Sequence, residues 1–369
     1  MRLLDRYLLR ELLIPLGYCL GGFLIVFCAF DLISQLNHLQ ERHLRFWEIA
    51  EYYVVTIPAL LNIIVPVSLL LALLYTLTDH ARHNELTAMR AAGVSLWRIS
   101  IPYFGVGLMA CVMVFFINEF WVPPSADWAN EILNRHESGG LNRNVLSKVK
   151  FLNEPEHRNW AIDKFNTLTG EMLKPNVSWE FADGSRRDIY ASNAVYSNHV
   201  WVFKTVEEWD PQSPRDQPSK SKTYKELELP FSETPEWIKS DIKISNMKVE
   251  QAAKKPQLSI KEIFTYLRLH PNVNQKQHVM LLTQLQGRIA DPFTSLAVVL
   301  IALPFGAPSG RRNVFVGVAA SIFICFGYLI LQRIFFGLGT GGYVPPFLAA
   351  WLPNAGFSIA GIVLISRVR

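Results

Sequence analysis

The sequence predicts an α-helical membrane protein with six transmembrane helices and one polar, β-rich domain inserted between the third and fourth. Half of the 369 residues are hydrophobic and only 18% are charged, against about 25% in a typical soluble domain. The charges are concentrated, because residues 122–289 hold 23 of the 36 Lys and Arg and 21 of the 31 Asp and Glu. This distribution excludes a soluble globule, a disulfide-linked secreted domain and a disordered chain.

Net charge and cysteine content add little to this fold class. The net charge of +5 divides into +2 for residues 122–289 and +3 for the rest, and neither part is basic enough to predict nucleic-acid binding. The four cysteines all fall inside apolar stretches, where they are typical of small buried hydrophobic residues. We find no cofactor motif and no metal-ligand pattern that predicts a bound group.

Six apolar stretches are long enough to cross a bilayer, whose core of about 30 Å needs about 20 helical residues. They are Leu12–Phe30, Tyr52–Thr78, Ile99–Asn118, Pro292–Gly310, Asn313–Gln332 and Ile334–Ser366. The first part of the last stretch is a glycine-rich loop with four glycines between residues 337 and 342, so its helix is expected to begin near Pro345. We therefore divide the chain into residues 1–121, 122–289 and 290–369, which hold three helices, the insert and three further helices.

Arginine positions predict the direction of insertion. If the N-terminus is cytoplasmic, ten arginines flank the spans on the inside and three on the outside, which is a clear positive-inside bias. The inner set is Arg2, Arg6, Arg10, Arg82, Arg90, Arg98, Arg311, Arg312, Arg367 and Arg369; the outer set is Arg42, Arg45 and Arg333. Both termini are then cytoplasmic, and the insert faces outward.

The insert alternates apolar and polar residues as strands do, with turn residues at Thr169-Gly170 and Asp183-Gly184. The expected strands are Val145–Leu152, Arg158–Asn166, Val177–Phe181, Ile189–Tyr196 and Val200–Val206. Residues 211–222 are expected to be a loop, and residues 259–270 and 277–290 to be helical. Short strands with regular turns predict a β-sandwich or jelly roll. Such a domain either has a packed core or holds acyl chains, and the residues alone favour the packed core.

Residues 79–98, between the second and third spans, are predicted to form a short interfacial helix. Leu86, Met89 and Val94 have near-helical spacing, and Gly93 offers a stop. Such a helix either lies on the lipid surface or presents a surface that an external motor can push, and spacing alone favours the lipid surface. His80 and His83 lie close to Glu85, but we expect these histidines to be solvated rather than to bind a metal.

Four stretches resemble the LptF/LptG family, the permease subunits of the lipopolysaccharide export transporter. The most specific are NELTAMRAAGVSLWRI in the loop and GYVPPFLAAWLPNAGFSIAGIVLISR at the end of the chain. The opening DRYLLREL resembles the family's first amphipathic helix, and GRIADPFTSLAVVLIALPFG resembles its fourth span. The resemblance covers the whole chain, although the insert matches only in position and pattern.

The resemblance implies a function and a set of partners. Family members pair as a heterodimer of two permeases in the bacterial inner membrane, and an LptB-type ATPase dimer docks below. Lipopolysaccharide is extracted from the outer leaflet of that membrane and passes through periplasmic jelly rolls toward LptC and LptA. The ATPase contacts the loop helix, which maps onto Glu85 with Met89, Arg90, Ala91 and Gly93 around it. The resemblance therefore reverses the earlier preference for a lipid-surface helix.

Three outer arginines are candidate lipid-phosphate ligands, because a guanidinium binds phosphate in a bidentate manner. Arg333 is expected near the outer interface, where it either binds lipid phosphate or extends to the surface. The family often has basic residues at the outer end of the first span, whereas this chain has Asp31 there, which leaves Arg42 and Arg45 as substitutes. Arg288, close to Asp291, is expected to form an ion pair or a helix cap.

The chain is not expected to be an enzyme. It has no phosphate-binding loop with a lysine, so ATP hydrolysis would need a separate subunit. The alternative function is a secondary transporter or channel for another amphipathic substrate. That class needs polar or charged groups inside the spans for ion coupling, and the sequence indicates almost none at mid-depth.

Overall fold

The computed structural model describes residues 3–41, 44–135, 145–181, 185–209, 221–245, 258–306 and 314–367. The chain divides into two compact units. The helical unit contains residues 1–137, 250–263 and 275–369, and the sheet unit contains residues 138–249 and 264–274. The sheet unit thus lies within the part of the chain that carries most of the charged residues, between residues 122 and 289.

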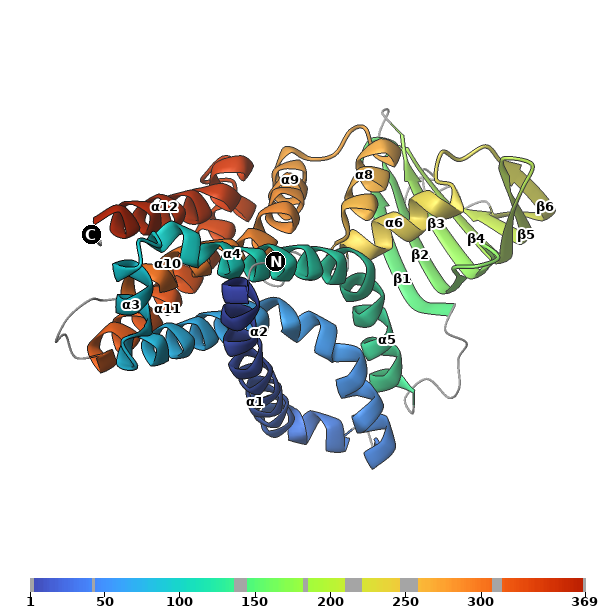
Figure 1. Ribbon diagram of the computed structural model, residues 1–369. Coiled ribbons are helices and arrows are strands. Elements are labelled where there is room, and N and C mark those ends of the chain that lie inside the picture. Colours follow the sequence, from blue (N-terminus) through green and yellow to red (C-terminus); the bar gives the residue numbers. More distant parts are fainter. Residues whose placement is uncertain are drawn as a thin grey trace. The chain divides into compact units, whose positions relative to one another are not determined.

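Helices form all the described regular structure of the helical unit (Figure 1). They are α1 (Leu3–Glu41), α2 (Phe46–Arg82), α3 (Glu85–Ala91), α4 (Leu96–Phe116), a π-helical turn (Ile117–Trp121), α5 (Val122–Asn134), α9 (Gln275–Ala290), a 3-10 turn (Asp291–Phe293), α10 (Thr294–Gly306), α11 (Val314–Thr340) and α12 (Pro346–Arg367). α8 (Ile260–Leu269) has residues in both units.

Six segments within the described residues are long and apolar enough to cross a membrane, which confirms the predicted class. They are Leu3–Leu36, Phe46–Arg82, Leu96–Ser125, Gln275–Pro304, Ile322–Thr340 and Pro346–Ser366. The fourth begins well before Pro292, because a 3-10 turn carries the helix through the Asp291-Pro292 pair without ending it. The fifth continues past Gln332 to Thr340, and the sixth begins at Pro346, as the glycine-rich loop predicts.

The core of the helical unit is built by α1, α2, α4 and α10, whose leucines and valines form one buried cluster. Glycine lets α12 approach α10 closely at one point. A Cβ atom on Gly361 would lie 2.9 Å from the carbonyl oxygen of Leu300, so no larger residue fits at this separation. Close backbone approach at small residues is typical of helix packing in membranes.

The sheet unit contains six antiparallel strands in the order β1-β2-β3-β4-β5-β6, so each strand pairs with its neighbours in sequence. The strands are β1 (Val145–Asn153), β2 (Arg158–Asn166), β3 (Met172–Glu180), β4 (Arg186–Ser197), β5 (Val200–Trp209) and β6 (Ser221–Leu229). All five predicted strands are present, although β3 begins five residues earlier than the prediction of Val177. β6 was not predicted, and it includes the last two residues of the predicted loop 211–222, whose residues 211–220 lie outside the described residues.

A crease crosses the sheet at one level. The ladder omits one residue of each strand, and these residues lie opposite one another. They are Lys148, Asp163, Lys174, Ser192, Thr205 and Lys225. In alternate strands this residue has a left-handed φ, at 54° for Lys148, 48° for Lys174 and 51° for Thr205. Because residues other than glycine rarely adopt this conformation, the crease is a backbone irregularity in β1, β3 and β5.

One face of the sheet packs against α6 (Pro235–Ser245), which Figure 1 shows in yellow beside the strands. Trp160, Trp201 and Phe203 are fully buried there and pack with Phe231 and Trp237 from the segment that follows β6. The sheet unit therefore has the packed aromatic core that the residues favour over an open groove.

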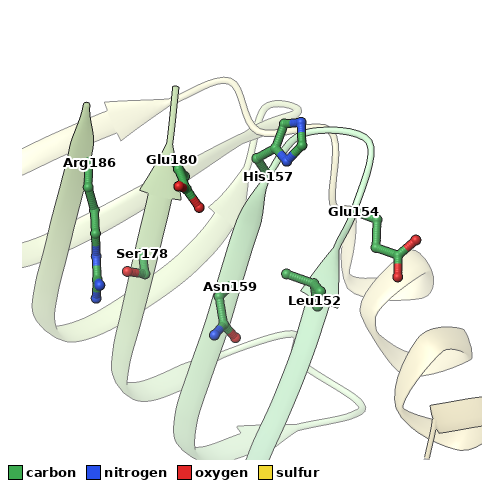
Figure 2. A pocket seen from close by; sticks show the side chains of 7 residues that line it. All are labelled: Leu152, Glu154, His157, Asn159, Ser178, Glu180 and Arg186. Atoms are coloured by element: carbon green, nitrogen blue, oxygen red, sulfur yellow. The ribbon is translucent and has the colours of Figure 1, made fainter. Parts of the chain in front are cut away.

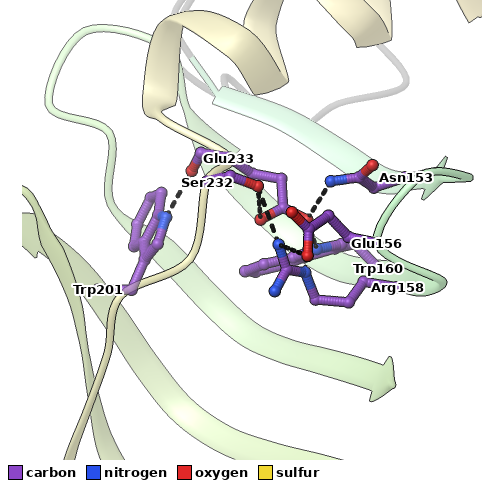
Figure 3. A network of polar contacts seen from close by, with 7 residues as sticks. All are labelled: Asn153, Glu156, Arg158, Trp160, Trp201, Ser232 and Glu233. Atoms are coloured by element: carbon purple, nitrogen blue, oxygen red, sulfur yellow. Dashed lines mark hydrogen bonds and ion pairs between the residues drawn. The ribbon is translucent and has the colours of Figure 1, made fainter. Parts of the chain in front are cut away.

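A buried carboxylate joins this core to the chain after β6. An oxygen of Glu233 accepts hydrogen bonds from Asn153 at 2.8 Å, from Arg158 at 2.9 Å and from Trp160 at 3.2 Å. Its backbone carbonyl accepts a further bond from the indole of Trp201 at 2.6 Å. Figure 3 shows these side chains converging on Glu233 from different strands. Buried charge is tolerated when it is paired and hydrogen-bonded in this way, so the network fixes the β6–α6 connection onto the sheet.

Candidate functional site

The turn between α2 and α4 contains the sequence that most specifically predicts a function. Two residues in the left-handed conformation bound its short helix α3: Asn84, with φ of 60°, and Gly93, with φ of 86°. Asparagine and glycine are the residues that adopt this conformation most readily. The helix within predicted residues 79–98 is therefore Glu85–Ala91, and the flanking residues belong to the ends of α2 and α4.

α3 has a buried side and a side of small residues. Leu86 is buried, and Met89 packs against the same core cluster. Thr87, Ala88 and Ala91 are exposed. The helix therefore presents a shallow surface of small side chains, while Met89 attaches it to the membrane helices.

Glu85, at the start of α3, is held by two other elements. The hydroxyl of Tyr7 on α1 lies 3.1 and 3.0 Å from its two carboxylate oxygens. Nδ1 of His80 on α2 lies 2.6 Å from one of them. An ionised carboxylate only accepts hydrogen bonds, so this geometry assigns the donor role to the Tyr7 hydroxyl and to Nδ1–H of His80. Glu85 keeps 36% of its side chain exposed.

The expectation that His80 is solvated is wrong. Its side chain is 2% exposed, its ring packs beside that of Tyr7, and its Nδ1 contacts Glu85. His83, by contrast, is exposed and bonds the backbone carbonyl of Asp79. Among the described residues no group of three His, Cys, Asp or Glu side chains could hold a metal ion. Sequence spacing missed the His80 contact because the histidine side chain faces inward from the last turns of α2.

A second contact joins α1 to the beginning of α4. An Nη atom of Arg98 lies 2.8 Å from a carboxylate oxygen of Asp5. Ser95 begins α4 as its N-cap and accepts a bond from the Arg98 amide at 3.3 Å. Asp5 and Tyr7 are thus both directed from the first turns of α1 toward the two ends of the α3 turn. Neither contact can be recognised in the sequence, because 78 residues separate Tyr7 from Glu85 and 93 separate Asp5 from Arg98.

Arg333 lies inside α11 rather than at its end, since the helix continues to Thr340. It is half-buried and lines a small hollow together with Asn62, Asp291 and Gln332. The hollow also borders Ile63, Thr294 and Leu329. The guanidinium of Arg333, the carboxylate of Asp291 and the two side-chain amides thus form a polar site on the surface of the helical unit.

A chain of polar contacts continues from this hollow into the spans. Gln332 donates to Asp291 at 2.9 Å. Thr294 and Tyr328 share a hydrogen bond of 2.9 Å, and the Tyr328 hydroxyl also bonds Asn354. The expectation of almost no polar groups at depth is therefore wrong. These polar residues are far apart in the sequence, and only the packing of the helices brings them together as one cluster.

The other arginine candidates are dispersed. Arg45 is the exposed N-cap residue of α2, and its backbone amide donates to Glu48 at 2.8 Å. Arg42 lies outside the described residues. Arg288 is buried and donates from Nε to the carbonyl oxygen of Leu258 at 2.7 Å and from Nη to that of Asn118. Arg288 therefore ties backbone segments together, where an ion pair or helix cap was expected.

Asp31, the departure from the family pattern, also has a structural role. Its carboxylate accepts hydrogen bonds from Gln35 at 2.7 Å and from the hydroxyl of Tyr53 at 3.2 Å. Tyr53 belongs to α2, so this acidic residue joins the far parts of α1 and α2. A basic residue at this position would lose both contacts.

The sheet unit has a hollow of about 630 Å³ on the face opposite its aromatic core. Figure 2 shows the seven side chains that line it. They are Leu152, Glu154, His157, Asn159, Ser178, Glu180 and Arg186. Six of these seven side chains are polar or charged, so the hollow does not have the apolar lining that acyl chains need.

The fold and the α2–α4 turn define a multi-pass membrane permease with a β-domain inserted between its third and fourth spans. Comparison with known proteins agrees. The sequence model of the LptF/LptG family, described as the lipopolysaccharide export system permease, matches residues 6–367. The chain therefore belongs to the LptF/LptG family, and its role is that of a lipopolysaccharide export permease that is not itself catalytic.

Individual relatives are distant. The lipopolysaccharide export system permease protein LptG of Escherichia coli strain K12 is 23% identical over 379 residues, covering 99% of this chain and 98% of that protein. LptG of Escherichia coli O6:H1 gives the same values. LptG of Haemophilus influenzae is 25% identical over 137 residues, covering 37% of this chain and 38% of that protein.

Proposed function

We propose that this chain is a membrane-embedded subunit of an ATP-driven transporter. The helix α3 would receive the conformational change, here called the stroke, of a separate ATPase. The chain would pair with a second LptF/LptG-type permease and dock on an LptB-type ATPase dimer. It would pass lipopolysaccharide from the outer leaflet of the bacterial inner membrane to LptC- and LptA-type jelly-roll proteins. Both termini would be cytoplasmic and the insert periplasmic, as the arginine bias predicts.

The observation that carries the proposal is the construction of α3. It is a seven-residue helix between two membrane helices, bounded by two left-handed residues, with exposed small side chains and a partly exposed carboxylate at its start. Small side chains let another protein's surface approach the helix backbone closely. Within this proposal Glu85, Arg90, Ala91 and Gly93 contact the ATPase, and Met89 attaches α3 to the core.

Lipid binding is proposed at the outer arginines. Arg333 is half-buried on α11, where its guanidinium can meet a phosphate group that approaches the surface of the helix. Arg45 is exposed at the start of α2 and can make a similar contact. Replacing Arg333 by Ala should weaken photocrosslinking of lipopolysaccharide to this rim. Crosslinking equal to that of the wild type would leave Arg333 as a residue that only extends toward the surface.

The proposed coupling role is tested on the assembled complex. Glu85→Arg reverses the charge at the proposed contact, so we expect it to abolish co-purification of the ATPase or ATP-driven lipid release. His83→Arg is the matched control, because it adds a positive charge at an exposed position two residues away, outside α3. The control should keep both activities. Unaffected lipid release in Glu85→Arg would overturn the coupling assignment.

A secondary transporter is the second candidate function, and the polar cluster around Asp291 is the observation that favours it. Asp291 is half-buried, and an acidic group in a span is a typical site for ion coupling. If Asp291 coupled an ion gradient to transport, Asp291→Asn would abolish lipid movement and a proton gradient alone would drive it. Under the favoured proposal, a proton gradient without the ATPase moves no lipid.

A further inference from the structure

The contacts of α1 are unevenly distributed along its length. Leu8 and Leu12, near its start, are fully buried in the core cluster. Farther along, Tyr18 is 78% exposed, and Ile25 and Phe30 are also exposed. Within this unit α1 therefore has one firmly packed end and a longer part with large exposed apolar side chains, which contacts α2 again at Asp31.

Polar contacts at the packed end connect α1 to three elements that meet at the α3 turn. Tyr7 bonds Glu85 of α3. Asp5 pairs with Arg98 of α4 at 2.8 Å. The carbonyl oxygen of Glu11 accepts a bond from the Thr76 hydroxyl of α2 at 3.1 Å. The first turns of α1 thus contact the same short helix that is proposed to receive the motor's stroke.

Two side chains, one from α1 and one from α2, contact the carboxylate of Glu85. Its carboxylate is shared between the Tyr7 hydroxyl and the His80 ring, and His80 is itself buried. The contact with His80 fixes the carboxylate relative to α2, whereas the contact with Tyr7 links it to α1. Without either hydrogen-bond donor, the Glu85 carboxylate would be held less firmly and could change rotamer.

We infer that Tyr7 and His80 are positioning residues: together they orient the Glu85 carboxylate and make α1 move with α3. This inference rests on the proposed coupling role of α3. A stroke on α3 then displaces the first turns of α1 directly, and the sparsely packed remainder of that helix follows. Without the Tyr7 contact, the same stroke reaches α1 only indirectly, through its contacts with α2 and α4.

The test measures lipopolysaccharide released per ATP hydrolysed, using the complete complex in proteoliposomes. Tyr7→Phe removes one hydroxyl and keeps the ring, and His80→Leu removes the ring donor. We expect each to lower the ratio by at least about fivefold, while ATPase co-purification and ATP hydrolysis persist. His80→Asn restores a donor close to the Nδ1 position, so its ratio should stay within about twofold of the wild type. Tyr18→Phe, an exposed tyrosine on the same helix, is the control.

The outcomes separate this inference from the proposed function. A purely structural role would reduce the yield of complex but leave the lipid-to-ATP ratio unchanged, and that result for Tyr7→Phe would overturn the inference. Tyr7 is partly exposed, so Tyr7→Phe decides the question even if His80→Leu fails to accumulate. If Glu85→Arg abolishes release and Tyr7→Phe does not alter the ratio, only the inference fails. If Glu85→Arg itself has no effect, the proposed function fails.

Discussion

The guanidinium of Arg158 donates from Nε to the carboxylate of Glu233 at 2.9 Å, and the two side chains are only 4% and 0% exposed. The same guanidinium lies over the rings of Phe231, 4.6 Å from the centroid, and Trp179, at 5.1 Å. This pair holds the segment after β6 against β2. A buried pair of this kind contributes little net free energy, but removal of one partner leaves an uncompensated charge.

Arg158→Met should therefore destabilise the sheet unit by about 3–5 kcal/mol. Adding Glu233→Gln should recover part of that loss, because the glutamine removes the charge and still accepts from Trp160. Arg186→Met is the control, since its ion pair with Asp188 is 58% exposed on the arginine side, and it should cost less than about 1 kcal/mol. Hydrogen exchange of the strand amides in the full chain measures all three. A double variant no more stable than Arg158→Met would contradict this account.

The crease predicts a glycine substitution in a strand that does not lower the stability of the sheet. Thr205 is β-branched and has a φ of 51°, a conformation that costs an L-residue about 1–2 kcal/mol and glycine almost nothing. Thr205→Gly should leave stability unchanged or raise it by up to about 1 kcal/mol. Thr223→Gly, on the neighbouring strand with ordinary strand geometry, should lower stability by about 0.5–1 kcal/mol. Equal losses in both variants, seen in hydrogen exchange of β5 and β6, would show that the crease carries no strain.

His270 and Asp241 predict opposite responses to acid in the sheet unit. Burial lowers the pKa of His270 to about 4, opposed by its hydrogen bond to the Tyr266 carbonyl. Burial raises the pKa of Asp241 to about 6, opposed by the bond from the Tyr266 hydroxyl. As the pH falls from about 6.5 to 4, the unfolded chain protonates its histidine and the folded chain does not, so stability falls. As the pH falls from about 6 to 4, the folded chain protonates Asp241 first, so stability rises.

These two effects offset each other in the wild type, and single substitutions separate them. Between pH 7 and 5, Asp241→Asn should lose roughly 2 kcal/mol of stability, whereas His270→Asn should gain roughly 1 kcal/mol. Hydrogen exchange of α6 amides, corrected for the intrinsic effect of pH, measures both slopes. Parallel slopes in the two variants would mean that these residues do not control the acid response.

The close approach of α10 and α12 predicts a sharp difference between two glycines on one helix. Gly361→Ala puts a methyl group 2.9 Å from the carbonyl oxygen of Leu300, so it should lower stability by about 1–3 kcal/mol. Gly356→Ala, on the same helix with nothing within 4 Å of the new Cβ, should cost nothing measurable. Thermal unfolding of the protein in detergent compares the two. Similar midpoints would mean that α12 can move away from α10 without loss.

Much of the fold follows from composition, because each membrane helix needs a long apolar run and the polar insert interrupts them. The start of the last helix at Pro346 was predicted from the glycines before it. β6 was missed because its sequence, SKTYKELEL, has more charged residues than apolar ones. The crease is likewise invisible in the sequence, since lysine and threonine give no local signal for a left-handed φ.

The candidate site was predicted only in part. Resemblance to the family identified Glu85 and the residues of α3, and the left-handed turns at Asn84 and Gly93 agree with the residue types there. The donors to Glu85 could not be predicted, because Tyr7 is brought to it only by the packing of α1 against α2 and α4. Met89, which the resemblance places among the coupling residues around Glu85, packs against the core cluster.

Lipid release from proteoliposomes tests the central claim most directly. Vesicles would contain lipopolysaccharide, this chain and the proposed second permease, with or without the proposed ATPase and with ATP or a non-hydrolysable analogue. We predict transfer of lipid to an added periplasmic acceptor only when the ATPase and hydrolysable ATP are both present. Equal transfer by the two permeases alone would contradict the account.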